Sequence, residues 1–274
     1  MINQCALCDC SHTFADFQIL EQLRDDSWGY LYLVQDSLEE KFLLRKLIFP
    51  HHHGLFKDVV LSEKFDSSFI AKPIHFFEFG NSICVVYKYR QDVEHFNSLK
   101  SLLSFTRREL IQIIIQLVIA LKCLHQNSII FRDLKFESIF IWREGGIIRT
   151  QLFDFCAACY SHDTQSEILR GTIPYMAPEL FFHNSCTFMT DIWALGVVFY
   201  FLVTSKFPFP SPRRALEVSQ FMYTEKDCFY YVFFLSTLSN PPKRRWSAQR
   251  LLGILEDHHG DEVLSLVEFC ASVE

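Results

Sequence analysis

Residues 129–141 read IIFRDLKFESIFI, and this stretch guides the interpretation of the whole chain. Its charged run, Arg132-Asp133-Leu134-Lys135, lies between two short apolar runs that are typical of buried strands. Charged side chains on a loop between such strands are candidates for catalysis or binding. Asp133 is therefore the first candidate for a functional residue.

The sequence after this stretch predicts a hairpin. Gly145-Gly146 separates two strand-like runs, as the two-residue turn of a hairpin does. Pairing about that turn places Ser138 opposite Phe153 and next to Asp154, while Asp133 lies on the loop that enters the hairpin. Carboxylates that converge with a hydroxyl offer the hard oxygen ligands that magnesium prefers. Two ordinary loop aspartates nevertheless explain the hairpin, taken alone, better than a metal site does.

Five further motifs accompany the central stretch. In chain order they are LLRK at 43–46, DFC at 154–156, GTIPYMAPE at 171–179, DIWALG at 191–196, and Arg244 in NPPKR. In order and spacing, the six motifs together resemble those of the eukaryotic-type Ser/Thr protein kinases. The resemblance covers about residues 14–255, and chance does not explain so many matches in the right order.

The resemblance implies an α+β, bilobal fold: a small antiparallel-sheet lobe with one helix, and a larger helical lobe. The first 90 residues read as strands at 17–20, 30–34, 42–48, 74–79 and 83–89, with one helix at about 54–65. We expect a ligand cleft between the lobes. The expected divisions are an N-terminal tail at 1–13, the small lobe at 14–90, the large lobe at 91–257 and a C-terminal tail at 258–274.

By resemblance, the chain would transfer the terminal phosphoryl group of ATP to a protein Ser or Thr. Lys46 would hold the α- and β-phosphates, and Asp154 would bind Mg²⁺ with Ser138 as a second ligand. Asp133 would receive or orient the proton of the attacking hydroxyl. Two neighbours are typical of Ser/Thr kinases: Lys135 and Thr172.

The resemblance also assigns binding and regulatory positions. Those around the nucleotide would be Gly29, Leu31, Leu44, Tyr87, Tyr89 and Phe140. Asp58 would pair with Lys46, and Glu63 is the alternative. Arg132 suggests control by phosphorylation between Asp154 and Glu179, because arginine pairs with phosphate. The acceptors there would be Thr164 and Ser166, and the large lobe would be held by Asp191 and by a pair of Glu179 with Arg244.

The chain departs from the kinase pattern in the phosphate loop. Residues 24–29 read RDDSWG, where kinases have three glycines, so only Gly29 survives. Asp25 and Asp26 would bring negative charge toward phosphate oxygens, which Arg24 offsets in part. Ser138 stands in place of the asparagine that binds a second magnesium.

Other departures lie in the catalytic loop and the adenine pocket. Cys156 replaces a glycine and Phe131 a histidine, while Leu44, Phe140 and Tyr87 add volume where adenine would lie. Two hypotheses follow. The chain is either a slow or restricted MgATP-dependent Ser/Thr kinase, or a pseudokinase that binds protein partners without catalysis.

Composition restricts the remaining classes. The net charge of −6 gives no basic footprint, which argues against nucleic acid as a partner, and no secretory signal is visible. Ten cysteines in such a chain favour reduced thiols in the cytosol or nucleus. The apolar segments 111–124 and 192–203 read as buried helices rather than membrane spans, and a capping box of Thr106 with Glu109 starts the first. We expect a protein substrate or partner; nothing indicates the oligomeric state.

Two cysteine clusters leave alternatives open. A tetrahedral zinc site could be built from Cys5, Cys8, Cys10 and His12, although the spacing is tight and chance clustering is the simpler explanation. Cys156 and Cys159 form a C-x-x-C that suits a redox switch, and two ordinary loop cysteines are the alternative.

Overall fold

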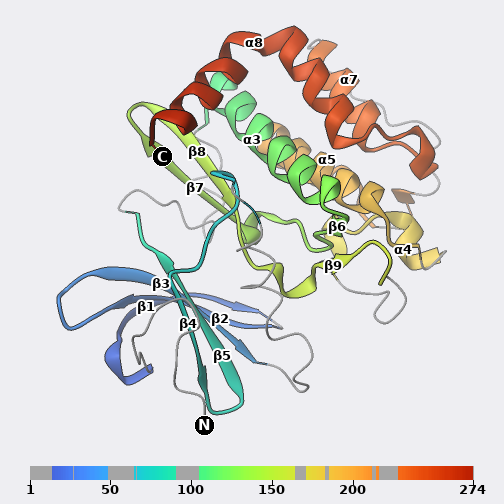
Figure 1. The fold of residues 1–274 in the computed structure, drawn as a ribbon. Coiled ribbons are helices and arrows are strands. Elements are labelled where there is room, and N and C mark those ends of the chain that lie inside the picture. The colour runs from blue at the N-terminus through green and yellow to red at the C-terminus, as the bar shows by residue number, and fades with distance from the viewer. Residues whose placement is uncertain are drawn as a thin grey trace.

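The computed structural model describes residues 14–26, 28–48, 65, 67–90, 105–163, 171–182, 185–211, 214–215 and 228–273. They form two lobes: an antiparallel sheet from the N-terminal part of the chain, and a larger, mostly helical lobe (Figure 1). The predicted α+β, bilobal fold class is confirmed.

The smaller lobe is built on one five-stranded antiparallel sheet in the order β1-β2-β3-β5-β4. Its strands are β1 (Gln18–Asp26), β2 (Gly29–Gln35), β3 (Lys41–Ile48), β4 (His75–Phe79) and β5 (Ser82–Lys88). All five predicted strands are present, but β1 continues well past its predicted end at residue 20. Its polar second half is held in the sheet because it pairs with β2 as far as Asp26 opposite Gly29.

Strand β3 decides which side chains face the larger lobe. Successive side chains of a strand point to opposite faces of the sheet. Leu43 and Leu47 pack in one buried cluster with Phe140 of the larger lobe, whereas Leu44 packs on the other face with Phe17. Odd-numbered positions of β3 therefore face the larger lobe, and even-numbered positions face away from it.

The larger lobe is built around long apolar helices. The described helices are α3 (Arg107–Gln126), α4 (Pro178–Phe182), α5 (Phe188–Thr204), α7 (Cys228–Thr237) and α8 (Ala248–Val273). The predicted capping box starts α3: Thr106 Oγ1 accepts from the backbone N–H of Glu109, whose carboxylate accepts from Thr106 N at 2.8 Å. The apolar segments 111–124 and 192–203 lie in α3 and α5 and are buried, as predicted. Of the described helices, α3 has the length and composition of a membrane span, but 67% of its apolar stretch is buried inside the fold.

The last helix continues through the segment that the sequence suggested was a tail. Residues 258–273 belong to α8, with non-helical backbone angles at His259. Val263 and Leu266 are buried in the hydrophobic core of the large lobe. This second half of α8 is therefore part of the packed domain, because it contributes side chains to the core.

Short strands position the functional loops between the lobes. The predicted hairpin consists of β7 (Ile139–Glu144) and β8 (Ile147–Leu152), while β6 (Ile129–Ile130) pairs with β9 (Cys159–Tyr160). Ile139 pairs with Leu152, and Phe153 N donates to Ser138 O at 3.0 Å. The register predicted from the Gly145-Gly146 turn is thus confirmed.

Several predicted features lie outside the described residues. They are the helix at about 54–65 apart from Phe65, the candidate partners of Lys46 (Asp58 and Glu63), the acceptors Thr164 and Ser166, and the cluster Cys5, Cys8, Cys10 and His12.

Candidate active site

Three of the predicted residues meet in one hydrogen-bonded group. Lys135 Nζ donates to Asp133 Oδ2 at 2.6 Å and to Thr172 Oγ1 at 3.1 Å. Thr172 Oγ1 donates to Asp133 Oδ1 at 2.8 Å. The lysine charge and the threonine hydroxyl together fix the orientation of the carboxylate. The structure therefore brings together Asp133, Lys135 and Thr172, which lie on two loops far apart in the sequence.

Asp191 of α5 holds the backbone of the loop that carries Asp133. Its buried carboxylate accepts from Phe131 N at 2.9 Å and from Arg132 N at 2.8 Å, and it lies 2.9 Å from His125 Nε2. Arg132 adopts a left-handed backbone conformation with φ of 72°, a strained arrangement that these bonds stabilise. Phe131 is fully buried and packs edge-on against Phe155, with ring centroids 5.0 Å apart, so its ring has a packing role.

Ser138 is bonded to its own loop. Its Oγ lies 2.9 Å from Lys135 O and 3.2 Å from Asp133 O, and accepts from Lys135 N at 3.1 Å. The side chain is buried, and its single hydroxyl proton is shared between two loop carbonyls. Ser138 therefore stabilises the turn, and its role as a metal ligand stays a prediction.

Asp154 is clamped by two arginines from the smaller lobe. Arg24 Nη2 lies 2.8 Å and Arg45 Nη2 lies 3.0 Å from Asp154 Oδ2, and the Cys156 thiol contacts Oδ1. Burial alone raises the pKa of this carboxyl, but the charges of Arg45 and Arg24 outweigh it and lower the pKa to about 2. Asp154 is thus an ionised carboxylate whose counter-charges are supplied by the protein.

The lysine predicted to hold phosphates does not reach this site. Lys46 lies on the outer face of β3, with Nζ 5.3 Å from the centroid of Phe14 and 5.1 Å from that of Phe79. Arg45 faces the larger lobe instead and is fully buried. The prediction of Lys46 was wrong by one residue, and a shift of one residue along a strand moves the side chain to the opposite face.

Arg45 joins the two lobes through two carboxylates. Its Nη2 donates to both oxygens of Asp26, at 2.9 and 3.1 Å, in addition to its contact with Asp154. Burial lowers the pKa of Arg45, but Asp154 and Asp26 raise it by more, so the guanidinium stays charged. Its Nε and Nη1 have no hydrogen-bond partner among the described residues.

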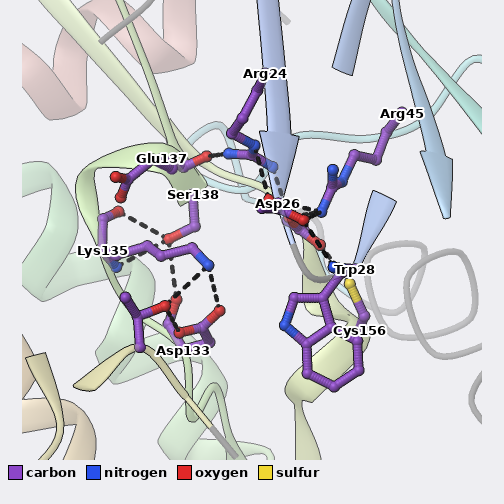
Figure 2. A network of polar contacts seen from close by, with 11 residues as sticks. Arg24, Asp26, Trp28, Arg45, Asp133, Lys135, Glu137, Ser138 and Cys156 are labelled. Carbon is purple, nitrogen blue, oxygen red and sulfur yellow. Dashed lines mark hydrogen bonds and ion pairs between the residues drawn. The ribbon is translucent and has the colours of Figure 1, made fainter. Parts of the chain in front are cut away.

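Arg24 reaches the larger lobe from the place where a phosphate loop was expected. Figure 2 shows its guanidinium between Asp26 and Glu137; its Nε lies 3.0 Å from Asp26 Oδ2, and Nη1 donates to the carbonyl of Glu137. Arg24 also contacts Asp154, so this one side chain links β1 to Glu137, just after the loop of Asp133, and to Asp154, just after β8. The sequence predicted for Arg24 only a partial offset of the charge of neighbouring aspartates, and this link between the lobes was not predicted.

Aromatic rings fill the region where adenine was expected. Phe140 and Phe153 stack with centroids 3.7 Å apart and planes 8° apart, and Tyr87 meets each of them edge-on at 5.7 and 5.8 Å. Leu31 and Leu43 close this buried cluster from the sheet. The predicted crowding is therefore present, with Phe153 as a contributor that the sequence did not reveal.

Two residues predicted to line the adenine pocket, Leu44 and Tyr89, lie at the outer face of the sheet and at the edge of the buried cluster. Leu44 lies on the outer face of the sheet, so the residue over the expected adenine position is Leu43, for the same reason of strand parity. Tyr89 is half-buried and packs against the edge of the cluster that contains Tyr87.

Gly29 is required by backbone packing. Its φ is 137°, and a Cβ at this position would lie 2.0 Å from the carbonyl oxygen of Lys46 on the neighbouring strand. Any side chain here would push β2 and β3 apart. This close approach of two strands explains the one glycine left in the degenerate phosphate loop.

The C-terminal ion pair of the larger lobe is formed by Arg245, not by Arg244. Arg245 donates to both carboxylate oxygens of Glu179, at 2.5 and 2.8 Å, and its guanidinium lies 4.7 Å from the Trp193 ring centroid. Arg244 is exposed in a short 3₁₀ turn, Pro242–Arg244. The prediction of Arg244 was wrong because that turn rotates the second arginine inward.

The arrangement does not fit MgATP. Asp154 is neutralised by two guanidiniums, Ser138 is turned into its loop, and stacked phenylalanines fill the adenine position. Within the part of the chain that the structure describes, no three His, Cys, Asp or Glu side chains are grouped as metal ligands. Nucleotide binding would require Arg24 to leave and the rings to separate.

Comparisons with known proteins agree with the motifs. The protein kinase domain family matches residues 40–267. The chain is 28% identical over 249 residues, 86% of its length, to Serine/threonine-protein kinase TIO of Arabidopsis thaliana, of which it covers 19%. It is 34% identical over 176 residues to Developmentally-regulated protein kinase 1 of Dictyostelium discoideum, covering 64% of this chain and 24% of the relative. The chain spans less than a quarter of the length of these two relatives.

Proposed function

The chain belongs to the protein kinase family, and from that premise we propose that it is a pseudokinase: a Ser/Thr-kinase-like protein that binds other proteins without transferring phosphoryl groups. Kinases of this family use ATP and Mg²⁺ and act on protein substrates. The observation that carries the proposal is the pair of ionic contacts from Arg24 and Arg45 to Asp154. They supply to the carboxylate the positive charge that a magnesium ion supplies in an active kinase.

The filled adenine region supports the same proposal. A nucleotide base needs a slot between the sheet and the β7–β8 hairpin, but Phe140 and Phe153 already stack against each other there. Opening the slot would expose aromatic surface that is now buried with Leu43 and Tyr87, at a cost of about 25 cal/mol for each Å². Burial of these aromatic rings therefore stabilises the closed arrangement against nucleotide entry.

Features beside the catalytic loop favour a protein partner. The group of Asp133, Lys135 and Thr172 is intact, and an apolar hollow of about 200 Å³ adjoins it, with Ile173, Met176 and Phe207 in its walls. The Ile173 side chain, 62% exposed, presents apolar surface to solvent next to polar groups that can bind a peptide. Such a surface suits a segment with a Ser or Thr followed by an apolar residue.

One observation favours a second function, a slow Ser/Thr kinase. Lys135 and Thr172 orient both oxygens of Asp133 as proton transfer from a substrate hydroxyl requires, and this geometry serves no evident purpose in a purely structural loop. In that case Arg24 would be displaced by MgATP, and the closed arrangement would be a resting state.

Thermal unfolding with ATP, with and without Mg²⁺, tests the proposal. We expect no resolved rise in melting temperature at millimolar nucleotide. A ligand at about 100 times its Kd adds about 2.7 kcal/mol to the free energy of unfolding, which corresponds to about 5–10 °C for a domain of this size. A rise of that size that needs Mg²⁺ would contradict the pseudokinase proposal and support the slow kinase.

Two variants sharpen this test. In Arg24→Ala the clamp is broken while Arg45 remains, so a Mg²⁺-dependent shift confined to this variant would identify Arg24 as a displaceable block. Phosphate incorporation into a Ser/Thr peptide library should stay at the level of Asp133→Asn for both the wild-type protein and Arg24→Ala. Transfer above that background by the wild-type protein would refute the proposal directly.

A further inference from the structure

A separate cavity of about 410 Å³ lies between the two lobes at the connection that joins them. Its walls come from residues 67–74 before β4, from the end of β5, and from the hairpin β7–β8. None of the described residues that line it belongs to β1, β2 or β3, which carry Arg24, Arg45 and the roof of the filled adenine region. The cavity is therefore distinct from the site around Asp154, although Tyr87 and Phe140 border both.

The lining of this cavity has the composition of a small-molecule site. Trp142, Tyr87 and Phe140 supply aromatic surface, and Ile70 and Ile74 add aliphatic surface. A few polar groups complete the walls. Ligand sites typically have volumes of about 300–1,000 Å³, mostly apolar walls and a small number of placed polar groups. Both the size and the chemistry of the cavity match that description.

Positive charge lines part of the cavity wall. Lys72, Lys88 and Arg90 line it, and no Asp or Glu is among the described lining residues, in a chain with a net charge of −6. The guanidinium of Arg90 lies 4.3 Å from the centroid of the Trp142 ring, which holds it beside the aromatic wall. An anionic group in the cavity would lie among these three cations.

Among the described residues, the carboxylate paired with Arg90 is that of Glu144. Arg90 Nη1 lies 3.8 Å from Glu144 Oε1, and the other oxygen of Glu144 lies 3.7 Å from Arg149 Nε. Glu144 therefore lies within ion-pair distance of both Arg90 and Arg149. Burial lowers the pKa of Arg90, Glu144 raises it, and the nearby charge of Arg149 lowers it again. An anion bound at this position would add a second counter-charge beside Arg90.

We propose that this cavity binds a compact aromatic acid, with its ring against Trp142 and Tyr87 and its acidic group on Arg90 and Lys88. A planar carboxylate pairs with guanidinium in a two-bond geometry, while the ring replaces water on apolar walls. The proposal goes beyond the pseudokinase function, because it concerns a different cavity and requires neither ATP nor Mg²⁺.

Binding here would act on both lobes. Residues 67–74 are tied to β8 by the hydrogen bonds Ala71 N to Leu152 O, at 2.8 Å, and Leu152 N to Phe69 O, at 2.9 Å. A ligand between this segment, the end of β5 and Trp142 contacts the smaller lobe, the connection and the larger lobe at once. The occupied cavity would therefore stabilise the observed arrangement of the lobes.

Isothermal titration of the full chain with three naphthalene probes tests the proposal. The probes are 2-naphthoate, the neutral 2-naphthamide and the cationic 2-naphthylmethylammonium. We expect 2-naphthoate to bind roughly tenfold more tightly than the amide, the amount that one charge-assisted hydrogen bond contributes, and the cation to bind most weakly. Equal affinity for the three probes, or no binding of 2-naphthoate at millimolar concentration, would overturn the proposal.

Variants locate the binding site. Arg90→Gln should weaken 2-naphthoate binding roughly tenfold. The control is Arg143→Gln, which removes a cation of β7 that does not line the cavity and should leave binding unchanged. Ser68→Trp should block the cavity without removing charge, because Ser68 lines it and holds Gln151 through its backbone carbonyl, which the substitution keeps. Melting curves check that each variant folds. Binding that survives Ser68→Trp would place the probe elsewhere and refute the site, whatever ATP does at Asp154.

Discussion

Arg24 of the smaller lobe and Asp154 of the larger lobe form a direct ion pair, with Nη2 2.8 Å from Oδ2. The two residues are 130 positions apart in the chain, and both side chains are almost fully buried. The guanidinium also donates to the backbone carbonyl of Glu137. The segment that was expected to form the phosphate loop thus supplies a cation, Arg24, that neutralises Asp154.

Replacing Arg24 by Ala should destabilise the fold. Asp154 keeps Arg45 as its partner, so the loss is that of buried hydrogen bonds rather than of an entire charge pair, about 1–3 kcal/mol in the free energy of unfolding. Urea denaturation measures it. Lys41→Ala, an exposed cation at the start of β3, is the control and should change stability by less than about 0.5 kcal/mol. Equal effects of the two substitutions would show that the Arg24 bridge does not form in solution.

Neighbouring positions of β3 should respond very differently to substitution. Arg45→Ala leaves Asp26 and Asp154 short of their shared counter-charge in a buried place, which costs about 3–5 kcal/mol. Lys46→Ala removes only contacts with two aromatic rings on the outer face, about 1 kcal/mol or less. Denaturant midpoints of the two variants decide the matter, and a larger loss for Lys46→Ala would reverse the assignment of the faces.

The ion pairs of Asp154 should make stability depend on pH. The pKa of Asp154 is lowered from 3.8 to about 2 in the folded protein, so its ionised form stabilises the fold above about pH 4. That contribution, about 2 kcal/mol, should be lost as the pH falls from 4 toward 2. In Asp154→Asn this part of the acid dependence should be missing. Parallel curves for both proteins between pH 5 and 2 would contradict the lowered pKa.

Arg245 and Arg244 offer a second matched pair. Arg245→Ala leaves the buried carboxylate of Glu179 without its two-bond partner and should cost about 3–5 kcal/mol, while the exposed Arg244→Ala should cost less than about 0.5 kcal/mol. Arg245→Lys should recover only part of the loss, because an ammonium cannot make both parallel bonds. Thermal melting ranks the three variants, and equal melting points for the two alanine variants would exclude Arg245 as the partner.

Much of the fold could be predicted because local sequence signals determined it. A Gly-Gly turn set the register of β7 and β8, and a Thr–Glu capping box set the start of α3. The group of Asp133, Lys135 and Thr172 followed from motif order, since the motifs carry their own spacing. These features depend on short stretches of chain, where residue type and geometry are closely linked.

The one-residue errors at Lys46 and Arg244 arose at adjacent basic residues, and the error at Leu44 follows from the same strand parity as that at Lys46. Arg45-Lys46 lies in a strand that is apolar on both faces, so no alternation of polar and apolar residues revealed which cation points inward. Arg244-Arg245 lies at the end of a 3₁₀ turn whose extent the sequence does not mark. A motif that asks for one cation cannot choose between two neighbours, and the choice is made by the packing around them.

The interlobe contacts could not be predicted for a different reason. Arg24 meets Asp154, and Phe153 stacks on Phe140, only once the sheet and the hairpin are placed against each other. The sequence reveals that these side chains are available, but the distance between them is a property of the whole fold.

The strand packing at Gly29 changes how degenerate relatives should be identified. A side chain at this position would collide with the Lys46 carbonyl whether or not a nucleotide is ever bound, so selection for a folded sheet is enough to retain the glycine after catalysis is lost. In evolutionary surveys, this last glycine therefore records ancestry and not activity. The two earlier glycine positions carry Arg24 and Asp26 here, whose side chains form ion pairs with Asp154 and Arg45, so their identity reports on the phosphate site and that of Gly29 on the sheet.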